Sequence, residues 1–428
     1  MPITHWLGQA DAVAQVVTVT PAGTIADETF TLTVGGADVA YIATGGDTAD
    51  EVAAGLADAW NASTHPYHAA VTAAADADVL TLTADEPGVP FVVEVDATGS
   101  ATLTPATVTA SAGPNDWSTA ANWSAGAVPV DNDTAVFEHH SAAVLWGLDQ
   151  SAVTLAELRV MHSYAGAVGL PDDRVTLAAG SADDAKPEYR QARLAIAATV
   201  VRIGDNPAGD IDATGAGRIR LDTGSAQTQL HITDTAAQSL DFGCAPVDWI
   251  GSHVNNAVHV QAGRIDLAAG QPGDTAVLQS LHVGQPNRLI APADVRLGAG
   301  LSMTTIRQAA GRIAIACDVE NLYQAGGFAH LTGSAAAGLA EIAGELQLDA
   351  AGGVTTLRIV ADGIVDLAAD ARAKTITNCE LYRGSAMDLR NANAGSVTFT
   401  NPIALVRCGL DDVTIHTPRH VTIAIDAG

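Results

Sequence analysis

Apolar and polar residues alternate in short runs over the first quarter of the chain, and one stretch changes to a helical period. The alternating runs predict six β-strands, at 16–19, 29–34, 39–43, 69–73, 79–83 and 91–95. Between the third and fourth runs, Val52, Leu56 and Trp60 repeat at helical spacing. Asp47 or Thr48, which precede them, can serve as the helix N-cap, with Asp50 and Glu51 in the first turn. The order predicts a small α+β domain within residues 1–110, whose single sheet buries one face against the helix.

The longest region, residues 151–428, repeats a glycine followed by a strand-like alternation. The motif begins at Gly217, Gly263, Gly311, Gly344 and Gly363, in steps of 46, 48, 33 and 19 residues. Most steps lie near one or two units of about 20 to 24 residues, which is typical of stacked coils. We therefore expect a mainly β protein, with the α+β domain followed by an irregular right-handed β-helix or solenoid. A β-sandwich array is the competing structure, but the hairpin turns that it needs are sparse.

Residues 111–150 join the two regions and contain an aromatic motif. Trp117 and Trp123 lie in Gly-Pro-Asn-Asp-Trp-Ser and Asn-Trp-Ser, and Phe137 follows. The segment resembles the opening of β-solenoids in surface and autotransporter-like proteins. We expect the two indole rings to cap the open apolar end of the first coil, and carbohydrate stacking is the alternative role for the same rings.

A second resemblance concerns the N-terminal domain. A β-hairpin, Gly-Asp-Thr-Ala at 46–49 and an Ala-rich helix succeed one another within residues 16–95. The arrangement is similar to a module of Mu-like tail sheath proteins of tailed phages, although the rest of a sheath subunit is absent. With the Trp motif and residues 164–171, the chain also resembles phage-type proteins that join this module to a Gly-punctuated β region. The resemblance implies a virion setting and brings no activity or functional residue with it.

Charge narrows the choice of partners. The 428 residues include 48 acidic and 20 basic side chains, giving a formal charge of −28. Binding to nucleic acid or to an anionic membrane needs clustered Lys and Arg, so we expect neither partner. No uninterrupted apolar stretch is long enough to span a bilayer, and the N-terminus lacks the features of a signal peptide. We therefore expect a soluble chain made in the host cytoplasm.

Metal and nucleophile chemistry finds little support in the sequence. His139 and His140 are adjacent and would point to opposite faces of a strand, and His253 and His259 are too far apart for one ion. The acidic turn at 131–133 lacks the remaining ligands of a calcium loop. Cys379 and Cys408 are predicted to be small core residues on strands, and no cysteine pattern fits zinc; the four cysteines are Cys244, Cys317, Cys379 and Cys408. No catalytic, cofactor-binding or metal-binding residue is predicted.

Charged residues on the predicted outer faces leave one alternative open. β-Helix enzymes that cut polysaccharides place paired carboxylates on neighbouring coils. The candidates for such a pair are Asp266, Asp349, Asp366 and Asp388. A solvated outer face is the simpler interpretation of these four. The arginines expected to point outward, and to pair with acids across coils or subunits, are Arg218, Arg220, Arg264 and Arg312.

These patterns favour a structural protein of a tailed-bacteriophage virion over an enzyme. The first expectation is a capsid decoration (cement) protein, with a tail fibre or tail-associated β-helical protein close behind. A secreted β-solenoid adhesin or polysaccharide-degrading enzyme is the alternative from another class. The expected partners are other virion proteins, either the major capsid protein or tail proteins, and further copies of the chain, with a homotrimer favoured.

Overall fold

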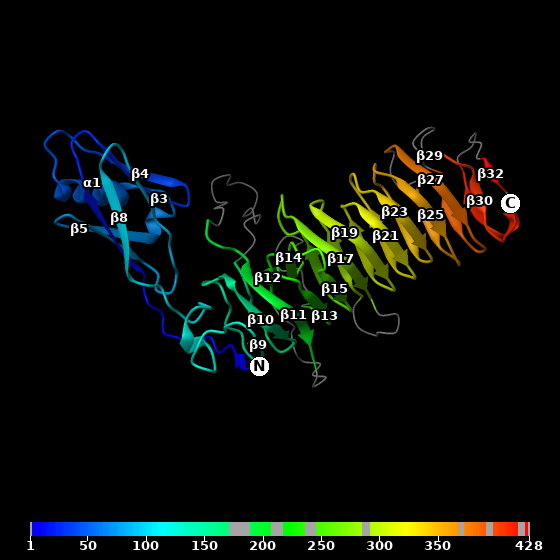
Figure 1. Ribbon diagram of the computed structural model, residues 1–428, viewed down its shortest axis with the longest axis horizontal. Helices are drawn as coiled ribbons and strands as arrows, with labels where there is room; N and C mark the ends of the chain where they lie inside the picture. Colours follow the sequence, from blue (N-terminus) through cyan, green and yellow to red (C-terminus); the bar gives the residue numbers. More distant parts are fainter. Residues whose placement is uncertain are drawn as a thin grey trace.

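The computed structural model describes residues 2–170, 189–206, 217–235, 245–284, 292–367, 372–390, 397–417 and 424–426. It is mainly β, with one α-helix and a long stack of parallel strands. Figure 1 shows the α+β domain, drawn in blue, beside the first coils of an elongated solenoid that ends near the C-terminus. The predicted fold class is confirmed.

The α+β domain forms its helix where the sequence predicts it. Helix α1 spans Ala49–Ala62 and begins with a capping box. The backbone N–H of Glu51 donates to the Thr48 hydroxyl at 3.4 Å, and the N–H of Thr48 donates to the Glu51 carboxylate at 2.7 Å. These two bonds satisfy amides that the first helical turn leaves without partners. Val52, Leu56 and Trp60 are buried, so the apolar stripe faces the domain core.

Two sheets, rather than the single predicted one, surround this helix. The strands are β2 (Val16–Ala22), β3 (Thr29–Val34), β4 (Ala37–Ile42), β5 (Val71–Asp76), β6 (Val79–Ala84), β7 (Glu94–Ala97) and β8 (Thr102–Thr109). They form a four-stranded sheet, β5-β6-β2-β8, and a three-stranded sheet, β4-β3-β7. Helix α1 contacts strands of both sheets. The strand expected at 91–95 begins only at Glu94. Phe91 is buried in the core, and the Gln15 side chain bonds both its backbone N–H and its carbonyl, in place of a neighbouring strand.

The domain is an insertion into the end of the solenoid. Strand β1 (Ile3–His5) pairs in parallel with β9 (Thr134–Phe137), so the first residues belong to the solenoid. A bridge then joins Val13 to Ala112, with the Val13 N–H donating to the Ala112 carbonyl at 2.7 Å. The chain therefore leaves the solenoid after Val13 and returns at Ala112, and the predicted segment 1–110 is divided between the two bodies.

Two ladders of parallel strands build the solenoid. The first ladder contains β1, β9, β10 (Asp149–Met161), β11 (Leu194–Asp205), β13 (Gln229–Ile232), β15 (Ala257–Val260), β17 (Ala276–Val283), β19 (Leu301–Gln308), β21 (Val319–Gln324), β23 (Ala337–Ile342), β25 (Val354–Ile359), β27 (Lys374–Leu381), β29 (Val397–Phe399), β30 (Ile403–Leu405) and β32 (Ile425–Asp426). The second ladder contains β12 (Ile219–Asp222), β14 (Val247–Ile250), β16 (Arg264–Leu267), β18 (Asp294–Leu297), β20 (Arg312–Ile315), β22 (Phe328–Leu331), β24 (Glu345–Leu348), β26 (Ile364–Asp366), β28 (Ala386–Asp388) and β31 (Thr414–His416). Most consecutive strands alternate between the ladders, as expected for stacked coils.

The coils differ in length along the stack. Leu230 pairs with Val258, whereas Ile306 pairs with Leu322, so the later coil needs little more than half the chain of the earlier one. The single unit expected from the glycine motif is therefore only an average. Ile313 and Leu346 occupy one inward column of the second ladder and are buried, as predicted.

Aromatic rings close the first coil. Trp117 and Trp123 are at most 1% exposed and pack edge-to-face, with their ring centroids 4.7 Å apart. Trp6 joins them from the N-terminal segment, 5.2 Å from Trp123, and Phe137 and Tyr164 complete the cluster. This confirms the cap and argues against carbohydrate stacking, because a sugar cannot reach buried rings.

Candidate functional site

A cluster of buried ions lies over the second ladder between β12 and β18. Arg220, Asp248, Asp266 and Arg296 are register partners on four successive strands of this ladder. Their side chains point away from the solenoid core, yet Arg220 is only 2% exposed and Asp266 is fully buried. The expectation that Asp266 and Arg220 lie on a solvated face is therefore wrong, because other segments of the chain cover this part of the sheet.

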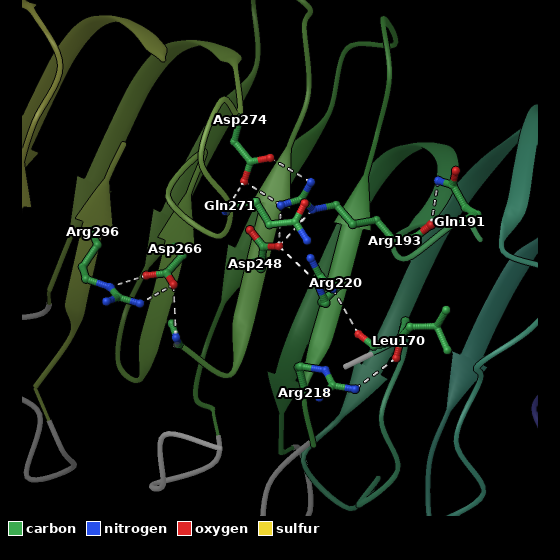
Figure 2. A network of polar contacts seen from close by, with 12 residues as sticks. Leu170, Gln191, Arg193, Arg218, Arg220, Asp248, Asp266, Gln271, Asp274 and Arg296 are labelled. Carbon is green, nitrogen blue, oxygen red and sulfur yellow. Dashed lines mark hydrogen bonds and ion pairs between the residues drawn. The ribbon is translucent and has the colours of Figure 1, made fainter. Parts of the chain in front are cut away.

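Arg193 holds the covering segments together (Figure 2). Its guanidinium donates to both carboxylate oxygens of Asp274, at 2.9 and 2.6 Å. It also donates to Asp248 at 2.9 Å. Arg220 donates to the same Asp248 oxygen at 3.3 Å and to the Leu170 carbonyl at 3.1 Å. The two arginines thus tie three parts of the chain to β14.

Asp266 forms a separate pair within the cluster. Arg296 donates to both of its carboxylate oxygens, and the backbone N–H of Ala245 donates to it at 3.1 Å. A bidentate guanidinium contact fixes the geometry of both side chains. Asp266 is therefore engaged in holding adjacent coils and their connection.

Burial governs the electrostatics of the cluster. It raises the pKa of Asp248, while Arg193 and Arg220 oppose that shift. For Arg193, burial acts to lower the pKa, but Asp248 and Asp274 outweigh it and raise the value. Such a group of charges is costly to break, since removal of one partner leaves another charge buried without compensation. Its arrangement suits cross-linking of the coils.

The other candidate carboxylates lie further along the stack. Asp366 and Asp388 are direct register partners on β26 and β28, so two of the four predicted acids do occupy neighbouring coils. Arg390 pairs with Asp388 at 2.6 Å, and this hydrogen bond lowers the pKa of that carboxyl. Asp349 lies outside the pair, accepting from Gln347 at 2.6 Å and contacting His330 at 2.7 Å.

The remaining outward arginines have individual partners. Arg264 pairs with Asp294 on the next coil at 3.3 Å, as expected for pairing across coils. Arg312 lies over the ring of Phe328, with 5.1 Å between the guanidinium carbon and the ring centroid. Arg218 donates to the Gly169 carbonyl at 3.2 Å.

A column of imidazoles and arginines, which the sequence analysis did not find, follows the outer face of the first ladder. We call it the imidazole–arginine column; its members are Arg159, Arg202, His231, His259, His282 and Arg307, in register on six successive strands. His259 belongs to it, whereas His253 lies in a loop, so the pair considered from the sequence is not the one that forms. The signal is hidden because the three histidines are unequally spaced along the chain, and their spacing becomes meaningful only once the coil lengths are known.

The three imidazoles stack on one another. Ring centroids are 5.1 Å apart between His231 and His259, and 4.7 Å apart between His259 and His282. Interplanar angles are 11° and 21°. Partial burial lowers the pKa of all three rings, and the neighbouring imidazoles and arginines lower those of His231 and His282 further. The rings are consequently neutral near pH 7, and acidification would add positive charge to the column.

The arginines at the two ends of the column differ in their pairing. Arg159 and Arg202 both contact Glu157, at 2.5 and 2.8 Å. Arg307 lies instead over the ring of Tyr323, 4.7 Å from its centroid. The parallel outward column, two residues earlier on each strand from β11 to β19, is uncharged and consists of Val200, Gln229, Ala257, Ser280 and Thr305.

Within the described ranges, no group of three or more His, Cys, Asp or Glu residues is arranged to hold a metal ion. In the acidic turn, Asp131 accepts from the Thr154 N–H at 2.7 Å and Asp133 accepts from the Val130 N–H at 3.0 Å, so both carboxylates shape the turn. The His140 ring likewise accepts a local backbone bond, from the Ala142 N–H at 3.0 Å.

The described cysteines are packing residues, and burial makes two of their thiols harder to ionise. Cys379 is buried on β27 as predicted, and burial raises the pKa of Cys317 and of Cys379 to about 12. Cys408 lies half-buried in a loop after β30, so its predicted place on a core strand is wrong. Cys244 lies outside the described residues.

Comparison of the chain with protein-family models and with curated proteins gives no significant match. Among the described residues, no helix combines the length and apolar character needed to cross a membrane.

Proposed function

We propose that the protein is a structural component of a tailed-bacteriophage virion and decorates the outer surface of the capsid. The observation that carries the proposal is the rod itself: parallel coils, closed at one end by buried tryptophans, with a small domain inserted at that end. Stacked coils bond most of their backbone groups to the next coil, which gives a rigid spacer. The resemblance of residues 16–95 to the sheath-protein module supports the virion setting.

The state of the carboxylates favours this role over polysaccharide cleavage. A glycosidase needs one carboxyl with a raised pKa as general acid and a second as base or nucleophile. Arg390 lowers the pKa of Asp388, and Asp266 is occupied by Arg296 and the Ala245 N–H. A tail fibre or another tail-associated component would use the same rod at a different place on the particle.

The proposed partners are the major capsid protein and further copies of the chain, arranged as a homotrimer, and the proposed location is the virion. Adding the purified protein to undecorated capsids tests this. We expect saturable binding at a fixed ratio to the capsid subunit, and mass spectrometry of particles should find the chain. Failure to bind capsids, combined with binding or cleavage of cell-surface glycans, would overturn the proposal in favour of an adhesin or depolymerase.

A further inference from the structure

The charges of the chain are divided between its two bodies. No Lys or Arg occurs before Arg159, so all 20 basic residues lie within residues 159–428 of the chain. Residues 1–110 contain 14 Asp and Glu residues and no Lys or Arg. The inserted α+β domain is thus purely acidic, and any contact that it makes through its charges must be with a cationic surface.

The α+β domain presents some of these acids on one flat face. Asp38, Glu94 and Asp96 are exposed on β4 and β7, the two edge strands of the three-stranded sheet. Asp38 and Glu94 flank Thr33 in one row, and Asp96 lies beside Thr31 in the next. Their inward neighbours Leu32 and Val39 are buried in the core, so these carboxylates point out of the domain.

The imidazole–arginine column is the basic counterpart on the solenoid: its arginines carry charge, and its three imidazoles gain charge on acidification. Its six residues cover five strand spacings, about 24 Å at about 4.8 Å each. On β10, Glu157 occupies the neighbouring outward column and pairs with Arg159 and Arg202; from β11 to β19, neither of the two columns contains an acid. No hydrogen bond of the described residues occupies the rings of His231, His259 or His282, which are half-exposed. In a chain of net charge −28, such a column is an unusual concentration of basic groups.

We propose that the imidazole–arginine column of one copy docks against the acidic face of the α+β domain of a second copy, at Asp38, Glu94 and Asp96. This inference rests on the self-association proposed above and supplies its interface. The domain of the same copy is engaged elsewhere on its solenoid. Tyr67 packs against Tyr189 with ring centroids 4.9 Å apart, and Arg190 donates to the Pro90 carbonyl at 2.8 Å.

Salt and pH act on this interface in definite directions. Two copies repel each other through their net charge, but at about 0.15 M salt that repulsion is screened beyond about 8 Å while close contacts persist. Acidification protonates the imidazoles, which face Arg202 and Arg307 along the column and Glu157 and Asp205 beside it. Opposing carboxylates would favour that protonation, so association strengthens as the pH falls from about 7.5 to about 5.5.

Reciprocal charge reversal tests the contact in the full chain. His259→Glu with Arg307→Glu reverses the column, and Glu94→Lys with Asp96→Lys reverses the domain face. In sedimentation at micromolar concentration, each reversed chain should associate at least about tenfold more weakly than the parent. An equal mixture of the two should regain association, because each then offers the complement of the other. A chain carrying all four changes should regain it as well.

Asp76→Lys with Asp78→Lys is the matched control, since it makes the same charge change at two exposed residues, Asp76 at the end of β5 and Asp78 in the turn that follows. We expect this chain to associate more nearly like the parent, and melting curves verify that each variant is folded. Replacement of His231, His259 and His282 by Gln should remove the pH response. An effect of the control equal to that of the face variant, or a mixture that stays dissociated, would overturn the interface.

Other outcomes separate this inference from the proposed function. A parent chain that remains monomeric at pH 6 but saturates capsids overturns the interface and leaves capsid decoration standing. A chain that associates as described but does not bind capsids overturns decoration alone. Retention on an acidic polysaccharide resin that depends on the column, without self-association at any pH, assigns the column to a glycan and overturns the inference.

Discussion

The solenoid satisfies its outward charges differently in its early and late coils. Around β12 to β18 most coils are long, and other segments cover the second ladder, so Asp248 and Asp266 are buried among arginines. From β20 to β26 the coils are shorter, and the same column carries half-exposed His330, Gln347 and Asp366. The alternation along a strand decides whether a side chain points into or out of the solenoid. The length of the connecting segments decides whether an outward side chain is covered or reaches solvent.

The inward column tests whether the two regions share one core. Ile265 in the early coils and Leu346 in the late coils are both fully buried in this column. Ile265→Asp and Leu346→Asp should each place an unpaired charge in the core and lower the free energy of unfolding by more than about 4 kcal/mol. Thermal and denaturant unfolding measure this, with Ile313→Asp as a third site. Parent-like melting of these variants would mean that the inward register is wrong.

Substitutions in the outward column of the second ladder should affect stability differently in the early and late coils. Asp248→Asn removes the charge that faces Arg193 and Arg220. We expect a loss of about 3 kcal/mol, because the buried Arg220 loses its carboxylate partner and Arg193 keeps only Asp274.

Asp366→Asn is the matched control, since the same change in the same column meets a less buried environment. Its expected effect is within about 0.5 kcal/mol. Equal losses from both substitutions would contradict the difference drawn between early and late coils.

The pH dependence of stability is the smallest expected effect. The folded-state pKa of His231, His259 and His282 is lowered by burial, whereas their unfolded-state value is ordinary. The unfolded chain therefore binds more protons, and the contribution to stability, complete above pH of about 6.5, is lost as the pH falls below it.

Between pH 7 and pH 5, the variant with all three histidines replaced by Gln should lose less in melting temperature than the parent does. The measurement needs dilute protein, so that association does not contribute. Parallel pH profiles of parent and variant would show that the stacked rings do not titrate as a group.

A feature could be predicted from the sequence where it depends on residues close together in the chain, and could not where it depends on distant ones. The start of α1, predicted at Asp47 or Thr48 and found at Thr48, depends on neighbours a few residues away, as does the inward place of Ile313 and Leu346. Both could be predicted. The burial of Asp266 depends on Arg296 and on the connection at Ala245, so alternation alone could not reveal it.

The imidazole–arginine column could not be predicted for the same reason. It forms because coils of unequal length place His231, His259 and His282 in register, and no fixed spacing in the sequence marks that alignment. The two sheets of the α+β domain were likewise hidden, since their alternation is identical to that of strands in one sheet.

The Trp cap sets an order of events for a chain emerging from the ribosome. Trp6 and β1 are made before the inserted domain but contact Trp123 and β9 only after that domain has been made. That domain has its own core and can fold in the interval. Once the cap closes, each new coil can add to the coil before it, so the unpaired strand edges are confined to the growing end of the rod.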